Sequence, residues 1–178
     1  MNRTLIYDTE TTGLIPNSVV DLRHQSHIIE FYGCVVDEGG NVIEELEFLC
    51  DPGIPLEPVI TRITGLTDKD LTTARPFKDY AIAVKDLIER CDSVVAHNLS
   101  FDEAMVGIEM RRCGVVVEWP LFRICTVEES EWYRGYRLSL TALHTHLFGE
   151  EFKDAHRARH DVEALTRCFV EMRKRGDL

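Results

Sequence analysis

The order of strand-like and helix-like segments is the feature of this sequence that most restricts its fold. Strand patterns rich in β-branched and aromatic residues cover 3–8, 27–37 and 41–49, and residues 38–40 supply a hairpin turn. After the proline-rich loop 50–60, helices are expected over 76–90, 101–113, 127–133, 138–147 and 157–175, and strands over 93–96 and 121–125. Three strands followed by such an alternation predict an α/β protein with a mixed central sheet flanked by helices.

The length of 178 residues predicts one domain over residues 1–178 with a sizeable hydrophobic core. Hydrophobic residues make up 44% of the chain and charged residues 29%, as in an ordinary globular protein. No apolar run reaches the roughly 18 residues of a membrane span, and the start of the sequence does not resemble a signal peptide. We therefore expect a cytoplasmic protein with no membrane partner.

The six cysteines are scattered along the chain, with no CxxC pair, at positions 34, 50, 91, 113, 125 and 168. A domain with this much core does not need disulfide bonds. We therefore expect buried free thiols.

Asp8 and Glu10 are the first part of a candidate catalytic site. The 31 acidic residues among 178 produce about five acid-x-acid pairs by chance, so the pair carries weight only together with other residues. Side chains two positions apart on a strand project from the same face. Carboxylate oxygens on one rigid face favour Mg²⁺ or Mn²⁺ over zinc.

Two further acids lie on the inward faces of expected helices. Asp102 is in line with Val106 and Met110, and Asp161 begins an apolar stripe that continues through Leu165. A carboxylate on a buried face must be neutralised. With the pair on the first strand, these acids could hold two divalent cations about 3.5–4 Å apart, as two-metal phosphoryl transfer requires.

His156 lies five residues before Asp161, in the expected loop before the last helix. An imidazole close to bound cations suits the role of general base for an attacking water. Together with the four acids, this histidine points to a phosphodiester-cleaving site.

Each residue of this set also has an ordinary explanation. A single acid can be a surface residue or can favour a helix N-terminus, and a lone histidine is usually a surface residue. A rival zinc site would use His144, His146, His156 and His160, but it lacks a neighbouring Cys pair or an HExxH arrangement. The presence of all five residues, in this order and in these sequence motifs, favours the phosphodiester-cleaving site over these alternatives.

The net charge of −11 argues against broad electrostatic binding along a nucleic-acid backbone. Two divalent cations would return four positive charges to the place where a phosphate must bind. The acidic composition is therefore compatible with a nucleic-acid substrate that is held mainly at the reacting phosphate.

These motifs resemble the histidine subtype of the DEDD superfamily of 3′→5′ exonucleases. Within it, the chain is similar to the proofreading epsilon subunits of bacterial DNA polymerase III. The resemblance covers nearly the whole chain, through DTETTGL (8–14), HIIEFYGCVV (27–36), ITGLTDKDL (63–71), VVAHNLSFD (94–102), LSLTALHTHLFG (138–149) and HRARHD (156–161).

The resemblance implies an RNase H-like fold and a set of site roles. It assigns cation ligation to Asp8, Glu10, Asp102 and Asp161, with two Mg²⁺ ions that Mn²⁺ can replace. It assigns the general base to His156, because the histidine subtype places His five residues before the last Asp.

The resemblance also implies how the substrate is held. Thr11 and Leu14 would contact the terminal nucleotide, with Leu14 wedged against the last base. Ile63 would pack on that base, and Asn98 and Phe101 would lie along the sugar and phosphate. For Leu14, Ile63 and Phe101 the alternative is ordinary core packing.

The expected function is a metal-dependent 3′→5′ exonuclease that releases nucleoside 5′-monophosphates from a single-stranded or frayed DNA end. The polarity follows from the resemblance alone. A 3′→5′ exoribonuclease would use the same five residues, and a silent 3′-end binding module would be favoured by the loss of one of them. Epsilon-type subunits continue into a polymerase-binding tail, whereas this sequence stops at Leu178. A DNA polymerase is thus a candidate partner without an expected tethering tail.

Overall fold

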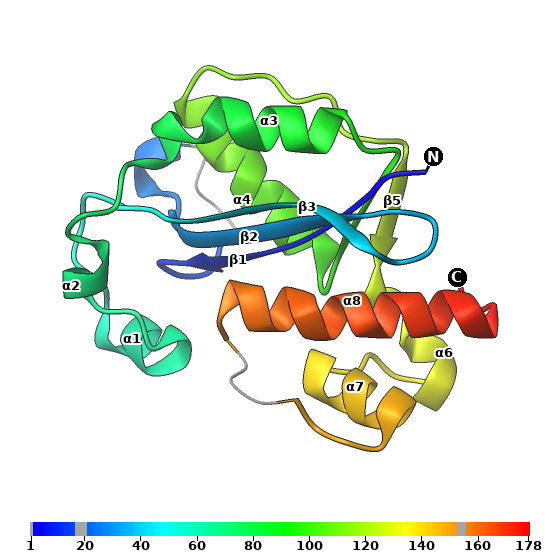
Figure 1. Cartoon of the computed structure of the whole chain (residues 1–178). Coiled ribbons are helices and arrows are strands. Elements are labelled where there is room, and N and C mark those ends of the chain that lie inside the picture. The colour runs from blue at the N-terminus through cyan, green and yellow to red at the C-terminus, as the bar shows by residue number, and fades with distance from the viewer. Residues whose placement is uncertain (1, 17–20, 153–155) are drawn as a thin grey trace.

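The computed structural model describes residues 2–16, 21–152 and 156–178 (Figure 1). Its centre is a five-stranded sheet in the order β3-β2-β1-β4-β5. The strands are β1 (Thr4–Thr11), β2 (Ile28–Val36), β3 (Val42–Leu49), β4 (Ser93–Ala96) and β5 (Phe122–Cys125). β2 is antiparallel to β1 and β3, whereas β4 and β5 run parallel to β1. The expected mixed sheet is confirmed.

Helices cover both faces of this sheet (Figure 1). The helices of the described residues are α1 (Pro58–Thr64), α2 (Asp68–Leu71), α3 (Ala81–Glu89), α4 (Leu99–Arg112), α5 (Thr126–Glu129), α6 (Glu131–Arg134), α7 (Leu140–Phe148) and α8 (Ala158–Arg175), with short 3-10 turns η1 (Leu22–His24) and η2 (Phe77–Asp79). α3 and α4 lie on one face and α8 crosses the other, with α7 packed against the outer side of α8.

The alternation of β1 decides which residues meet which layer of helices. Leu5 and Tyr7 belong to the core under α3 and α4, whereas Ile6 packs with Val162 and Leu165 of α8. Because side chains alternate between the faces of a strand, Asp8 and Glu10 share the α8 face with Ile6. Thr9 then points to the α4 face.

The hairpin between β2 and β3 is closed by the expected turn. The Asp37 carboxylate accepts hydrogen bonds from the backbone N–H groups of Gly39 and Asn41 at 2.8 and 2.9 Å. Gly40 has a φ of +80°, and a Cβ there would lie 2.6 Å from a methyl carbon of Val170. Only glycine therefore fits this position, which lets the hairpin approach α8.

The expected element boundaries were wrong in four places. The expected helix 76–90 is the 3-10 turn η2 followed by α3, which begins at Ala81. α1 begins at Pro58, inside the segment expected to be a loop, because proline suits the first position of a helix. α2 was not expected, since its four residues have no periodic pattern, and a capping box between Thr67 and Asp70 stabilises it. The expected helix 127–133 is two short helices that meet at Ser130.

All six cysteines are free thiols, as expected. Four are buried and two, Cys113 and Cys125, are half-buried. Within the described ranges, no helix is both long and apolar enough to cross a membrane.

Candidate active site

The carboxyl ends of the parallel strands β1 and β4 bring the first acids together. Asp8 and Glu10 lie near the end of β1, and α4 starts three residues after β4. Thr9 joins the two elements, because its backbone N–H and its hydroxyl both donate to Asp102 Oδ1, at 3.1 and 2.7 Å. Asp102 is buried, and both hydrogen bonds from Thr9 fall on Oδ1, so Thr9 does not occupy Oδ2.

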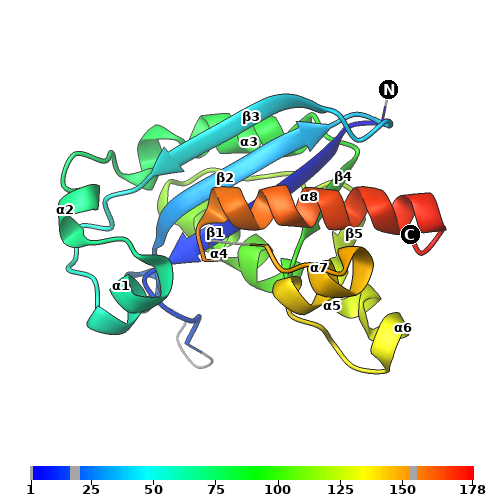
Figure 2. The ribbon, with the colours of Figure 1, turned by 60° about the horizontal axis from the view of Figure 1, so that its bottom comes forward.

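The start of α8 supplies the other two expected residues. The backbone N–H of His156 donates to Asp161 Oδ2 at 3.0 Å. One potential ligand atom from each of Glu10, His156 and Asp161 lies within 4.8 Å of the others. Figure 2 shows the start of α8 beside the end of β1. The structure therefore gathers residues that are about 150 positions apart in the sequence.

Glu30, which the sequence analysis missed, lies next to this group. It is opposite Glu10 in the β1–β2 register and is 1% exposed. Its carboxylate accepts hydrogen bonds from the Arg157 guanidinium at 2.8–3.2 Å and from the backbone N–H of Ala158 at 3.2 Å. A single acid inside the apolar run of β2 was the available signal, because a buried charge requires a partner.

Burial perturbs the four expected acids, and repulsion by the other acids of the set adds to it at Asp8 and Glu10. Burial, followed by the charges of Asp102, Glu10 and Asp161, raises the pKa of Asp8 well above its ordinary range. Burial also comes first for the other three, and it raises the pKa of Glu10 to about 8, that of Asp102 to about 7 and that of Asp161 to about 6. In the protein alone, Glu10 and, to a smaller extent, Asp102 therefore hold protons that ordinary surface acids have lost at neutral pH.

This donor set fits divalent cations. Hard carboxylate oxygens converge from one strand and two helices, and their repulsion is what a bound cation would relieve. The rival zinc site is not assembled in the described part of the chain. His144 Nδ1 lies 2.8 Å from the carbonyl oxygen of Glu150, the His146 ring packs on Tyr133, and neither joins the Glu10–His156–Asp161 group.

The expected substrate residues divide into exposed and packed side chains. Leu14 is 82% exposed and Ile63 is 46% exposed, so neither is a core residue. Asn98 is exposed and begins α4 with a φ of +83°. Phe101 packs partly against the core, and the buried Thr11 donates its hydroxyl hydrogen to the carbonyl oxygen of Gly13 at 2.9 Å. α1, which carries Ile63, lies at the same end of the sheet as the start of α8 (Figures 1 and 2).

Curated proteins align with almost the whole length of this chain. DNA polymerase III PolC-type of Bacillus subtilis is 30% identical over 176 residues, which are 96% of this chain and 11% of that protein. The corresponding protein of Streptococcus suis is 28% identical over 169 residues, again 11% of its length. The chain thus spans about a tenth of the length of these curated relatives.

Solved structures share the fold. A complex of Escherichia coli exonuclease I with single-stranded DNA, in its zinc-bound form, superimposes with a TM-score of 0.80 at 20% identity, covering 98% of this chain and 41% of that one. Exonuclease X in complex with 5′-overhanging duplex DNA gives a TM-score of 0.69 at 22% identity, covering 97% of this chain and 93% of that one. These neighbours confirm the RNase H-like architecture.

The sequence model of the RNase T family, described as an exonuclease family, matches residues 5–169. This match includes the four expected acids, Glu30 and His156, and it ends only a few residues short of the end of α8. The chain therefore belongs to the RNase T family of exonucleases, within the DEDD superfamily of 3′→5′ exonucleases.

Proposed function

We propose that this chain removes nucleotides from the 3′ end of DNA, one at a time, as nucleoside 5′-monophosphates, with two divalent cations as cofactors. The convergence of Asp8, Glu10, Asp102 and Asp161 beside His156 carries this proposal, because their raised pKa values mean that the protein alone does not compensate their ionised form. A single-stranded or frayed end is the form of substrate that can reach such a site with its terminal phosphodiester.

The acids of the site would be the cation ligands. Asp8, Glu10, Asp102 and Asp161 offer oxygen atoms to Mg²⁺, or to Mn²⁺ in its place. When bound, such cations stabilise the attacking and leaving oxygens of an in-line phosphoryl displacement. The Thr9 hydroxyl donates to Asp102 Oδ1 and so holds the Asp102 carboxylate beside the end of β1.

His156 would take the proton from the attacking water. It is exposed, which gives its ring access to solvent, and its backbone is tied to Asp161. If His156 has this role, the chain is of the histidine subtype, as the HRARHD motif predicts. His160 stands on the first turn of α8 and is the alternative base.

The exposed apolar side chains near the site would hold the terminal nucleotide. Leu14 and Ile63 have the exposure that stacking against a base requires. Asn98 and Phe101, at the start of α4, would lie along the sugar and phosphate, and Thr11 would shape the loop that carries Leu14.

DNA is proposed as the substrate on the names of the relatives. The curated relatives are DNA polymerases, and the solved neighbours are complexes with single-stranded and overhanging DNA. Residues 1–178 would form one exonuclease domain acting in the cytoplasm, alone or together with a DNA polymerase.

The test uses matched DNA and RNA oligonucleotides labelled at the 5′ end, incubated with Mg²⁺ and resolved by length. We expect a ladder that shortens by single nucleotides on DNA, nucleoside 5′-monophosphates in the supernatant, and no reaction in excess chelator. Mn²⁺ should restore activity, and Zn²⁺ alone should do so poorly. Immediate release of the 5′ label, faster degradation of RNA, or full activity in chelator would each contradict one part of the proposal.

A further inference from the structure

Arg157 stands between the expected base and the first residue of α8. It follows His156 directly and precedes Ala158. Its guanidinium donates through Nε and Nη2 to both oxygens of Glu30, and the backbone N–H of Ala158 donates to the same carboxylate. Three N–H donors at the start of α8 therefore bind one carboxylate on β2.

Glu30 is the one charged residue of β2, whose nine residues are all buried. The Glu30 side chain is 2% exposed, whereas that of Arg157 is 43% exposed. A buried carboxylate is costly unless it is paired and fully hydrogen-bonded. β2 pairs with strands on both sides and cannot shift easily. The ion pair thus connects a rigid part of the sheet to the residue next to His156.

The backbone of His156 needs such a connection. Its φ of +69° is in the left-handed region, where only one other described residue that is not glycine, Asn98, is found. This conformation is unfavourable for a residue with a side chain, and it persists only where the surroundings impose it. On one side Asp161 accepts the N–H of His156. On the other side the backbone continues into Arg157, which Glu30 holds.

We propose that Glu30 and Arg157 are positioning residues, which fix the backbone at 156–158 so that the His156 imidazole stays beside Glu10 and Asp161. The inference rests on the proposed function, in which His156 is the base. It predicts that loss of the pair lowers turnover through the placement of His156, with little effect on the binding of the 3′ end.

The same helix offers a matched control. Arg159 makes a similar bidentate contact with Glu47 of β3, through Nε at 3.1 and 3.2 Å. Both side chains are more than a third exposed, and the contact does not involve His156 or Ala158. Exposed ion pairs contribute little to stability. Glu47→Gln should therefore remove a bidentate contact to α8 without changing turnover.

The first experiment measures kcat and KM of Glu30→Gln on a 3′ DNA end, with His156 present and in a His156→Ala background. Loss of a residue that orients a metal ligand typically costs about 10–100-fold. We expect a fall of this size in kcat, with KM changed less than about twofold. In the His156→Ala background the further loss should shrink to less than about twofold, because a positioning effect disappears with the group that is positioned.

A second experiment observes the histidine without any reaction. In protein labelled with ¹⁵N-histidine and free of metal, the ring resonances of His156, identified by their absence in His156→Ala, should move toward those of free histidine in Glu30→Gln. They should keep their positions in Glu47→Gln. If Glu30→Gln does not fold, Arg157→Lys, which keeps the charge and loses the bidentate fork, takes its place in both experiments.

The outcomes separate the two proposals. An inactive wild-type chain would overturn the proposed function, while the ring resonances would still test the positioning. An active wild type with unchanged kcat in Glu30→Gln would overturn the inference alone. An equal loss in both backgrounds, or unchanged ring resonances, would also overturn it, because the pair would then act on something other than His156.

Discussion

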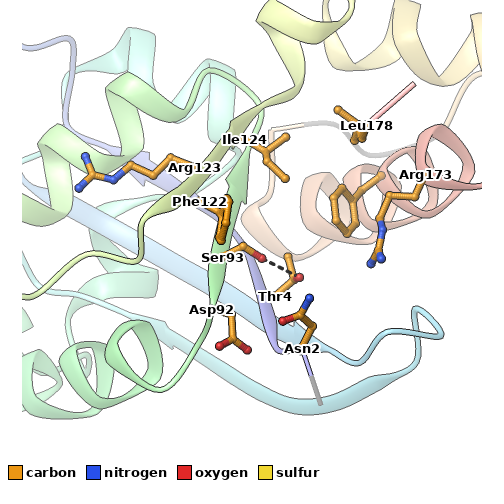
Figure 3. Close-up of a pocket in the computed structure, with 10 residues that line it drawn as sticks. Asn2, Thr4, Asp92, Ser93, Phe122, Arg123, Ile124, Arg173 and Leu178 are labelled. Carbon is orange, nitrogen blue, oxygen red and sulfur yellow. Dashed lines mark hydrogen bonds between the residues drawn. The ribbon is translucent and has the colours of Figure 1, made fainter. Parts of the chain in front are cut away.

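At the amino end of β1 the polar side chains bond to one another, whereas at its carboxyl end they repel. Thr4 and Ser93 share a hydrogen bond of 2.8 Å, and Asp92 accepts the backbone N–H of Arg3 at 2.8 Å. Thr4, Asp92 and Ser93 line a cavity of about 300 Å³, shown in Figure 3. At the other end, Asp8 and Glu10 face further acids.

The two ends belong to one strand and one pair of layers, so the difference is not one of fold. At the amino end the polar groups form hydrogen bonds within the chain, as buried polar groups of folded proteins generally do. The carboxyl end keeps acids whose pKa values are raised by burial and by each other, a state that costs stability. Such sets are characteristic of functional sites, where a ligand supplies the missing charge.

The largest effect that tests this comparison is the loss of one acid from the carboxyl end. Asp8→Asn should abolish hydrolysis of a 3′ DNA end, a larger loss than the roughly 10²–10⁴-fold expected for a missing general base. Asp92→Asn, at the amino end, should keep wild-type turnover. Initial rates of mononucleotide release compare the two. Equal activity of both variants would remove the functional distinction between the ends.

His156→Ala should lower kcat by about 10²–10⁴-fold, because water would then lose its proton acceptor. Metal binding should survive, since four acids remain. The control is His160→Gln, which lies four residues further along the chain, in the first turn of α8, and should retain most of the activity. If His160→Gln loses activity and His156→Ala does not, the base is His160, and the expected histidine subtype is wrong at this point.

The sequence was sufficient to predict the layers of the fold. It also selected the five residues of the candidate site, whose catalytic roles stay predictions. Asp8 and Glu10 could be placed on one face because a strand has a period of two, and Asp102 and Asp161 because each begins a buried helical stripe. These are local patterns, and the fold then brings them together. The exposure of Leu14 and Ile63 could not be predicted in this way, because an apolar residue in a loop reads the same in a core or at a substrate site.

Glu30 was missed because its meaning depends on a distant residue. Within IIEFYGCVV it reads as one acid in a core strand, and its partner Arg157 is 127 positions away. Arg157 in turn reads as a spacer of the HRARHD motif. Only the antiparallel register, which sets Glu30 beside Glu10, shows that the pair lies next to the candidate site. The short helices α1 and α2 escaped prediction because they are too short for a helical period.

The carboxyl end should make the metal-free protein sensitive to pH. The folded pKa values of Glu10 and Asp161, about 8 and about 6, lie above the ordinary values of 4.5 and 3.8. A raised folded pKa means that the folded state binds more protons, so the stability from protonation is full below about pH 4 and is lost as the pH rises through about 6–8. The Tm without metal should therefore fall from about pH 5 to about pH 8, and thermal scans in chelator check this.

A smaller effect is expected when one repelling charge is removed. Asp161→Asn keeps an oxygen that can accept the N–H of His156, but it lacks the charge. At about pH 8 without metal it should raise the Tm, by about 2–4 °C for each kcal/mol of repulsion relieved. At about pH 5 the gain should vanish, because the acid is already neutral there. Destabilisation at both pH values would make Asp161 a structural residue.

The most direct test of a cation site at the carboxyl end is calorimetric titration of the wild-type chain and Asp8→Asn with Mn²⁺ at pH 7, in two buffers of different ionisation enthalpy. Since the pKa of Glu10 is about 8 and that of Asp102 about 7, both carry protons that a cation must displace. We expect the wild type to bind Mn²⁺ with release of about one proton or more, and Asp8→Asn to bind far more weakly. Absence of binding by the wild type, binding without proton release, or equal binding by Asp8→Asn would contradict the account.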